Sequence, residues 1–363
     1  MPYTYTYGSG TEQDPYQIWT MEDLNGVRDY PNSHFIQMAN INLVDATCVS
    51  PYSQHDIGFL PIGRFWDANK EEWGLTSFRG SYNGNNYRLL NLRIDWSEEE
   101  EYYGTAQVGL FSSIAPLNDN TVSLKNIAIH DAVIKANECR EIGILAGFLT
   151  GGWYNGKIVI SKCGVQGTIN HNECWNIGGL IGSAVGGNYP EDLKIEKCFT
   201  CVDISMASEQ YIACFVGNLQ VALVRDCFAM GSIALIDSDY YAGGFAGYFE
   251  DVDIKNCYCA VAMEILSGTE YGGFVGGEWD STLENCYYNS DLANLSDIGK
   301  GIPKTTAEMT WPYSNPSNVY IDWDFEEVWA HDATGKINNG YPYLKWQKPQ
   351  RVPKFIFKVP YWI

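Results

Sequence analysis

Two stretches of this chain nearly copy each other: ECREIGILAGFLTGG at residues 138–152 and ECWNIGGLIGSAVGG at residues 173–187. The same box continues in YIACFVGN (211–218), YAGGFAGY (241–248) and YGGFVGGE (271–278), and VGLFSSI (108–114) is an earlier, degenerate copy. Self-similarity with a period of roughly 30 residues indicates a repeat architecture rather than a pair of unrelated globular domains.

One glycine of the box recurs in every complete copy. A residue without a Cβ lets the chain turn a corner close to the next coil, where a side chain would clash. The degenerate copy carries Ser112 at this position, and the complete copies carry Gly147, Gly182, Gly217, Gly247 and Gly276.

A second ladder runs in step with the glycines. Its motifs run from LKNIAI (124–129) to LENCYY (283–288), and after Ile127 in the first motif they place a cysteine at Cys163, Cys198, Cys227, Cys257 and Cys286. An apolar residue precedes each ladder position by three. A third short segment follows it and carries Ile169, Ile204 and Ile233 in successive repeats.

Each repeat therefore predicts about three short strands, which must stack on neighbouring repeats to bury their apolar faces. The predicted fold is all-β: a right-handed parallel β-helix of about seven coils, with equivalent strands roughly 4.8 Å apart. We divide the chain into an entry strand and helical cap (1–45), the β-helix (46–295), a C-terminal cap (296–347) and a tail (348–363). Thr20 to Asp23 fits a capping box, and tryptophans around Trp323 and Trp329 suit a plug for the last coil.

The repeats resemble the GLUG motif family, which is named for Gly-Leu-x-Gly and is represented here by GGLIG at Gly178 to Gly182. The segments GSGTEQDPYQIWTMEDLNGV, FRGSYNGNNYRLLNLRI and GYPYLKW look like the family's opening, first coil and closing segments, so the resemblance covers about residues 8 to 347. It departs at Ser112 and at Ala213-Cys214. The resemblance implies a β-helix of the kind found in surface adhesins, secreted proteases and phage particles, with no shared catalytic residues.

The composition is strongly acidic. A formal net charge of −21 repels phosphate backbones and anionic membranes, so we expect no nucleic-acid binding and no membrane insertion. The start MPYTYTYGSG lacks a secretory pattern, so we expect either a removed signal or release by another route such as lysis. From Lys345 onward the chain carries five basic residues and no acidic one, and KFIFKV alternates basic with apolar residues, as a strand added to a partner's sheet would.

The eleven cysteines are predicted to be buried core residues, because parallel stacking points neighbouring thiols the same way and suits the disulfide torsion poorly. Disulfides and a metal site are the alternatives. Unpaired thiols favour assembly in a reducing compartment, as for a phage product. The five histidines show no metal-binding spacing and are expected at the surface or in turns, and no cofactor is expected.

Catalytic residues are not predicted, with one weak exception. Asp251 and Asp280 each follow a box glycine by four residues, so adjacent coils should bring them about 5 Å apart. Such a pair could bind Ca²⁺ or cleave a polysaccharide. The alternative, which we favour, is that both are turn residues whose carboxylates bond nearby backbone amides.

Aromatic residues in the loops are candidates for stacking on sugars or on a partner protein. In the repeats they are Trp153, Tyr154, Trp175, Tyr240, Tyr241 and Trp279, and in the tail the contact candidates are Lys354, Phe355, Phe357 and Lys358.

The favoured function is a non-catalytic structural and attachment protein on a virion or cell surface, in particular a bacteriophage tail fibre, spike or head appendage. It would contact other virion or surface proteins through the tail and a cell-surface glycan through its loops. A β-helix polysaccharide depolymerase or lyase and a bacterial surface adhesin are the alternatives. No residue pattern encodes a threefold interface, so homo-oligomerisation stays open.

Overall fold

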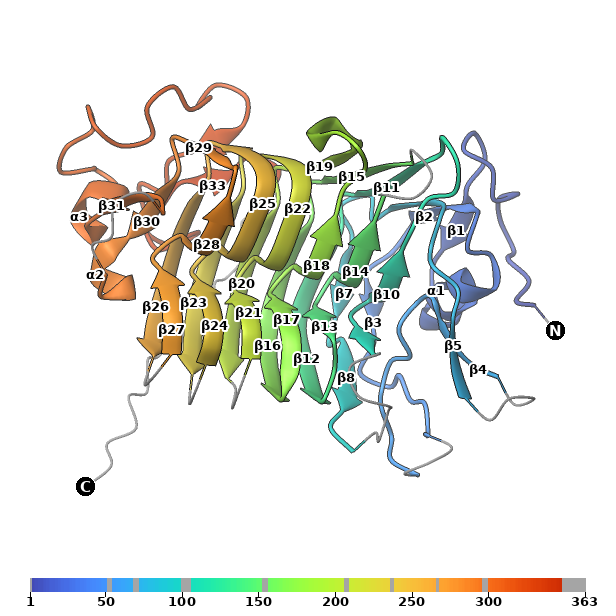
Figure 1. Ribbon diagram of the computed structural model, residues 1–363. Coiled ribbons are helices and arrows are strands. Elements are labelled where there is room, and N and C mark those ends of the chain that lie inside the picture. The colour runs from blue at the N-terminus through green and yellow to red at the C-terminus, as the bar shows by residue number, and fades with distance from the viewer. Residues whose placement is uncertain are drawn as a thin grey trace. The chain divides into compact units, whose positions relative to one another are not determined.

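The computed structural model describes residues 2–50, 54–67, 72–98, 106–151, 156–205, 209–235, 238–265, 268–295 and 300–347. The chain forms two compact units, residues 1–303 and 304–363. The first unit is built almost entirely from parallel strands (Figure 1), which confirms the predicted all-β class.

Three sheets of parallel strands form the first unit in the described chain. Sheet 1 contains β1 (Tyr16–Ile18), β2 (His34–Gln37), β6 (Ser81–Asn83), β10 (Phe111–Ile114), β11 (Thr121–Lys125), β14 (Ala146–Thr150), β15 (Lys157–Ser161), β18 (Ile181–Val185), β19 (Leu193–Glu196), β22 (Val216–Arg225), β25 (Ala246–Lys255), β28 (Val275–Trp279) and β29 (Thr282–Glu284).

The other two sheets hold the remaining strands of the stack. Sheet 2 contains β3 (Ile41–Asn42), β7 (Arg88–Leu90), β8 (Arg93–Trp96), β12 (Ala128–Asn137), β16 (Gly164–Asn172), β20 (Phe199–Ser205), β23 (Phe228–Leu235), β26 (Tyr258–Ile265), β30 (Tyr287–Asn289) and β31 (Ile302–Lys304). Sheet 3 contains β9 (Gln107–Val108), β13 (Glu141–Gly143), β17 (Cys174–Gly178), β21 (Glu209–Ala213), β24 (Ser238–Gly243) and β27 (Gly268–Gly272).

Equivalent residues of successive repeats are register partners, as the sequence period predicts. Ile169 pairs with Ile204, which pairs in turn with Ile233. The side chains between the sheets form one continuous apolar core. All cysteines of the predicted ladder lie in this core, none more than 1% exposed.

The corners of the stack rely on left-handed backbone. The residue before each ladder position has a positive φ, between 51° and 55°, at Asn126, Lys162, Lys197, Asp226, Asn256 and Asn285. Asn and Asp tolerate this conformation better than other residues with a side chain, which explains their frequency here.

The N-terminal helix α1 (Met21–Gly26) begins at Thr20, whose hydroxyl accepts from the Asp23 N–H while the Asp23 carboxylate accepts from the Thr20 N–H. This confirms the predicted capping box. Leu24 and Val27 are fully buried and belong to the same core as the strands, so the helix lies at the start of the stack. A 3₁₀ turn (Val27–Asp29) follows, and α2 (Ser290–Ala293) and a second 3₁₀ turn (Pro190–Asp192) occur later.

Two hairpins are antiparallel. The strands β4 (Arg64–Asp67) and β5 (Glu72–Leu75) belong to the first unit, and β32 (Trp329–Ala330) and β33 (Tyr343–Leu344) belong to the second, which also contains α3 (Thr306–Met309). The second unit has the predicted aromatic cluster: the Trp323 and Trp329 ring centroids are 4.5 Å apart. Its role as a cap stays a prediction.

Candidate functional site

The box glycines occupy the bend where sheet 3 meets sheet 1. A Cβ on Gly182 would lie 2.5 Å from the Ile142 nitrogen, and one on Gly217 would lie 2.6 Å from the Gly182 carbonyl oxygen. Real Cβ atoms do not come this close to backbone atoms, so glycine fits at these positions and a larger residue would clash, as predicted.

Two rows of residues flank this glycine row on the strand face away from the core. Their neighbours along each strand, such as Ile142, Ile177 and Ile212, point into the core, and successive strand residues point to opposite faces. We call the two rows the corner strip. Sheet 3 contributes Gln107, Glu141, Asn176, Tyr211, Tyr241 and Glu270, and sheet 1 contributes Ser113, Phe148, Ser183, Asn218, Tyr248 and Gly277.

Three tyrosines meet across the bend. The Tyr211 and Tyr241 rings stack in adjacent repeats with centroids 5.7 Å apart, and the Tyr248 ring lies 5.5 Å from the first and 5.4 Å from the second. A Cβ on Gly277 would lie 2.5 Å from the Tyr241 ring, so this glycine provides room for the cluster. All three rings are half-buried, which leaves part of each available to a ligand.

Toward the N-terminus the strip becomes buried and polar. Glu141 is 3% exposed and Asn176 is 8% exposed. The Arg140 Nε lies 3.1 Å from the Glu141 Oε1, while the Glu141 Oε2 and the Asn176 Oδ1 are buried without a hydrogen-bond partner. Burial raises the pKa of Glu141 to about 7, against the opposing effects of Arg140 and of a hydrogen bond from Gln107.

The cysteine ladder is a hydrogen-bonded chain of thiols rather than a reactive site. The Cys163 N–H donates to the Cys198 Sγ and the Cys198 N–H donates to the Cys227 Sγ, both at 3.4 Å. The Cys198 thiol donates in turn to the Glu196 carbonyl oxygen at 3.2 Å. None of the eleven cysteines forms a disulfide in this structure, which speaks against the disulfide alternative. Burial raises the pKa of the ladder thiols from Cys163 to Cys257.

A cleft of about 590 Å³ opens on the outer side of β2, β6 and β11, in the N-terminal repeats. Its walls include Glu12, Arg79 and Lys125, and the His34 Nδ1 and Ser81 Oγ within it are hydrogen-bonded at 2.7 Å. Sequence reasoning missed this cleft, because its strand residues on β2 and β6 precede the regular repeats, and Glu12, Asn32 and Arg79 come from loops that the repeat period does not place.

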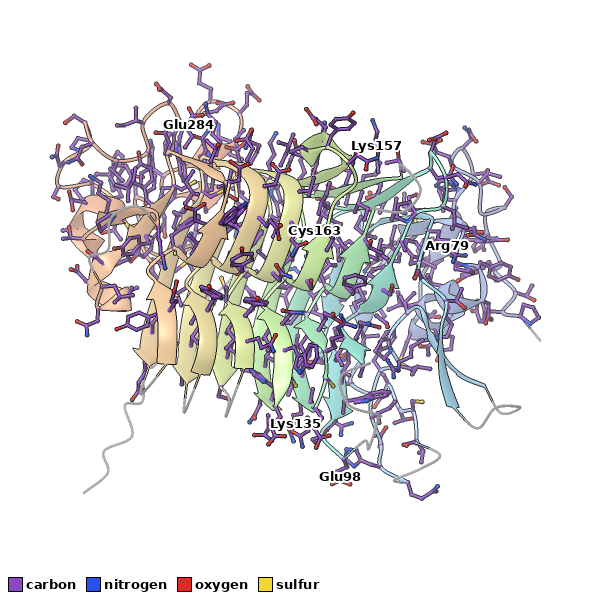
Figure 2. All side chains as sticks on the ribbon, viewed as in Figure 1. Arg79, Glu98, Lys135, Lys157, Cys163 and Glu284 are labelled. Atoms are coloured by element: carbon purple, nitrogen blue, oxygen red, sulfur yellow. The ribbon has the colours of Figure 1, made fainter. Side chains whose placement is uncertain are left out.

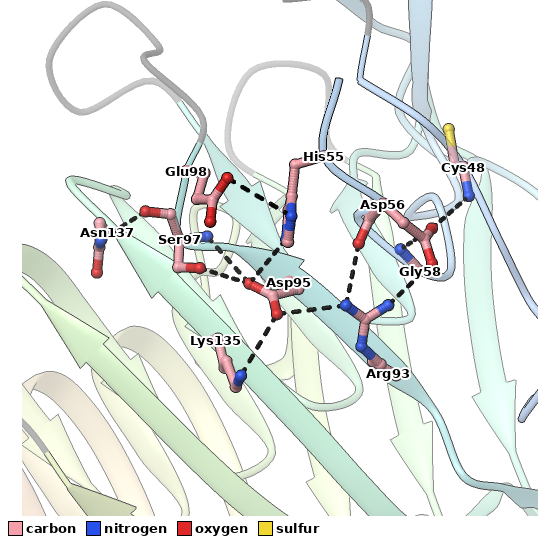
Figure 3. A network of polar contacts seen from close by, with 10 residues as sticks. All are labelled: Cys48, His55, Asp56, Gly58, Arg93, Asp95, Ser97, Glu98, Lys135 and Asn137. Atoms are coloured by element: carbon pink, nitrogen blue, oxygen red, sulfur yellow. Dashed lines mark hydrogen bonds and ion pairs between the residues drawn. The ribbon is translucent and has the colours of Figure 1, made fainter. Parts of the chain in front are cut away.

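A polar network joins the loop around His55 to β8 and β12 (Figure 3). Both oxygens of the buried Asp95 are engaged: Ser97 donates at 2.6 Å, and Lys135 and His55 lie 3.5 and 3.4 Å away. Burial raises the pKa of Asp95, but the Ser97 hydrogen bonds and the charge of Lys135 outweigh it, so this pKa lies below its usual value. The network fastens the loop to the stack.

The structure places Asp251 and Asp280 at equivalent positions, as predicted, and both are exposed. Their φ angles are 55° and 48°, and Val221, one repeat earlier, has a φ of 52°. Both residues therefore lie at a left-handed bend, Asp251 within β25 and Asp280 directly after β28. The expected carboxylate bonds to backbone amides do not occur in the described chain, because neither side chain makes a hydrogen bond or ion pair there.

Other predicted contact residues are distributed along the stack. Trp175 is 44% exposed and lies under the Arg140 guanidinium, 5.7 Å from it, and Trp279 is 69% exposed. Trp153, Tyr154, the Tyr240 side chain and the tail residues Lys354, Phe355, Phe357 and Lys358 lie outside the described residues. Tyr211 and Tyr248 were missed, although the recurring tyrosine at the box's edges was a signal for them.

The expectation for the histidines was wrong at two positions. His130 and His171 are 5% and 3% exposed. His171 alternates with the core residue Ile169 along β16, whereas His130 lies at the register shift of β12, next to the core residue Ile129. Burial, together with the charge of Arg88, lowers the pKa of His130 to about 4. Among the described residues, no three His, Cys, Asp or Glu side chains are grouped to hold a metal ion, and no helix is long and apolar enough to cross a membrane.

The fold and the corner strip define a class: an all-β protein of stacked parallel strands with an aromatic and polar strip along one bend. No family model matches the chain. Two solved structures share the fold. An immunoglobulin A1 protease assigned in Bacteroides ovatus superposes with a TM-score of 0.64 and 18% identity over 95% of this chain and 96% of its own. Another, named IgA1 protease, gives 0.51 and 17% over 79% of this chain and 21% of its own.

Two curated proteins match parts of the chain. A protein named as a Gly-rich membrane protein of Evansella cellulosilytica is 31% identical over 116 residues, which are 30% of this chain and 13% of that protein. Halomucin of Haloquadratum walsbyi is 27% identical over 145 residues, which are 40% of this chain and 1% of that protein. This chain therefore resembles only a small part of each curated relative.

Proposed function

We propose that this chain is a non-catalytic structural and attachment module of a surface, built as a right-handed parallel β-helix of about seven GLUG-type coils. The observation that carries the proposal is the tyrosine cluster of the corner strip. Tyr211, Tyr241 and Tyr248 present half-exposed rings on a rigid stack, and such rings pack well against the apolar faces of sugars. The expected ligand is a cell-surface glycan.

The names of the similar proteins support a surface setting. One is named as a membrane protein, and the others are named as a halomucin and as proteases of an immunoglobulin. These names favour a bacterial cell-surface adhesin as the second form of the proposal. The eleven cysteines, none of them in a disulfide, favour the first form, a phage tail fibre, spike or head appendage assembled in a reducing cytoplasm.

The test measures binding of the full chain to cell-surface polysaccharide. Tyr241→Ala and Tyr248→Ala should each weaken binding roughly three- to tenfold through loss of ring contacts. Tyr189→Ala is the matched control, because Tyr189 is 68% exposed and lies outside the strip. Equal binding by all variants would contradict the assignment of this strip.

Two further measurements address the rest of the proposal. The non-catalytic role predicts that the polysaccharide acquires no new reducing ends during incubation, whereas cleavage lost in Asp280→Ala would establish the depolymerase alternative. Mass spectrometry of purified phage particles and of peptides shaved from intact cells would distinguish a virion component from an adhesin. The chain should be found in one of these two samples.

A further inference from the structure

We propose that the cleft on β2, β6 and β11 is a second binding site, which takes a carboxylate-bearing sugar such as a uronic acid residue of a polysaccharide. The starting observation is Arg79, labelled in Figure 2. Its Nε is buried with no hydrogen-bond partner, and in the described part of the chain its side chain makes no ion pair. Arg79 also lines the cleft, and no acidic side chain of the described residues neutralises its charge, so the charge is available to an anionic ligand.

The charge of the cleft stands out against the rest of the protein. The chain carries −21 overall, yet this cleft combines Arg79 with Lys125, which likewise makes no ion pair with any described residue. A guanidinium binds a planar carboxylate through two parallel hydrogen bonds. Glu12 on the same wall repels a doubly charged phosphate more strongly than a singly charged carboxylate, so the carboxylate is the better match.

The neutral part of the lining suits a sugar. Ser81 and Ser123 are register partners on adjacent parallel strands, and Asn83, two residues after Ser81 on β6, is the register partner of Lys125. Hydroxyl and amide groups at strand spacing can hydrogen-bond successive sugar hydroxyls. The cleft volume of about 590 Å³ lies within the range of small-molecule sites. Cationic groups that can bind a carboxylate and neutral groups that can bind sugar hydroxyls therefore occur together in one cleft.

This site deepens the attachment proposal, because it adds a preference for acidic glycans, but it uses none of the corner strip. The experiment titrates the full chain with trigalacturonate and with the matching neutral galactose trimer. Binding of the acidic trimer should weaken at least about tenfold in Arg79→Gln and several-fold in Lys125→Gln, the range expected for a lost charged hydrogen bond. Lys194 is the register equivalent of Ser123 two strands away, on β19. Lys194→Gln removes the same charge there and should leave the binding of the acidic trimer unchanged.

Lys125 is exposed, so Lys125→Gln keeps the test informative even if Arg79→Gln fails to fold. Four results would overturn the assignment: no binding of the acidic trimer, equal binding of the neutral trimer, competition by acetate at equal carboxylate concentration, or displacement by inorganic phosphate. Loss of polysaccharide attachment in Tyr248→Ala with acidic-trimer binding intact would separate this site from the corner strip.

Discussion

The two ends of the stack differ in how much chain each repeat uses. In the N-terminal part, 47 residues separate Ile36 from its register partner Asn83, and 42 separate Asn83 from Lys125. In the C-terminal part, 29 separate Lys255 from its partner Glu284. The same strand register is therefore maintained by long repeats at one end and by minimal repeats at the other.

The extra residues of the long repeats account for the irregular features. They form the hairpin of β4 and β5 and the loop that the Asp95 network fastens to the stack, and the neighbouring loops contribute Glu12 and Arg79 to the cleft. The short repeats have no room for such excursions. The surface proposed to bind a glycan is instead built from the repeat itself, since Tyr211 and Tyr241 stack from equivalent positions of adjacent repeats.

The prediction with the largest expected effect on the free energy of unfolding concerns the packing of the short repeats. Gly182→Ala places a Cβ 2.5 Å from the Ile142 nitrogen, so the sheets must separate, and we expect a loss of more than about 3 kcal/mol in the free energy of unfolding. Ser112→Ala is the control from the long repeats. That position already has a buried side chain whose hydroxyl lacks a partner, so a change of about 1 kcal/mol or less is expected there.

Urea unfolding followed by circular dichroism measures both variants. Similar midpoints for the two would show that the bend opens cheaply, and the steric account of the glycine row would be wrong.

The second prediction concerns the pH dependence that Glu141 adds in the N-terminal part of the corner strip. The folded state holds its proton up to about pH 7, whereas the unfolded chain releases it near the ordinary value of 4.5. The folded state therefore binds more protons in this window, and the free energy of unfolding should fall by up to about 3 kcal/mol as the pH rises through it.

Glu141→Gln replaces the carboxyl group with an amide that does not ionise, so the variant should lack that fall and should be more stable than the parent protein at pH 8. Glu264→Gln makes the same change at an exposed position and should keep the parent pH profile. Thermal unfolding between pH 4 and pH 8 compares the three proteins, and parallel profiles for the parent and Glu141→Gln would refute the prediction.

The third prediction tests the thiol ladder of the short repeats. Cys227→Ala removes a thiol that accepts from the Cys198 N–H and donates to the Arg225 carbonyl, so we expect a loss of about 1–2 kcal/mol. Cys48→Ala, at a half-buried cysteine of the long repeats, should cost less than about 0.5 kcal/mol. Maleimide should label Cys48 first in the native protein and all eleven thiols only in denaturant, and fast native labelling of Cys227 would contradict the buried ladder.

The sequence period predicted the regular part of the molecule, because each residue packs against the equivalent residues of the neighbouring repeats. Once the glycines and cysteines align, the strand register, the core ladder and the bend follow from stacking. The α1 capping box was also readable, because it is local. Arg79, His55 and the loop to Asp95 could not be placed, since long excursions are not constrained by the period. Glu141 was visible in the box, but its burial depends on the folded bend.

The smallest effect tests which residue types favour the left-handed bend within β25 and at its equivalents. Val221, Asp251 and Asp280 share a left-handed backbone, which costs a β-branched residue more than it costs Asp or Asn. Val221→Asn should therefore stabilise the protein by about 1 kcal/mol, whereas Asp251→Asn and Asp280→Asn should change the unfolding midpoint little. That pattern would assign the two carboxylates to the turn, because an amide fulfils the same conformational role. A loss of glycan binding or of a bound cation in the two Asp→Asn variants, with stability unchanged, would instead return a functional role to the pair.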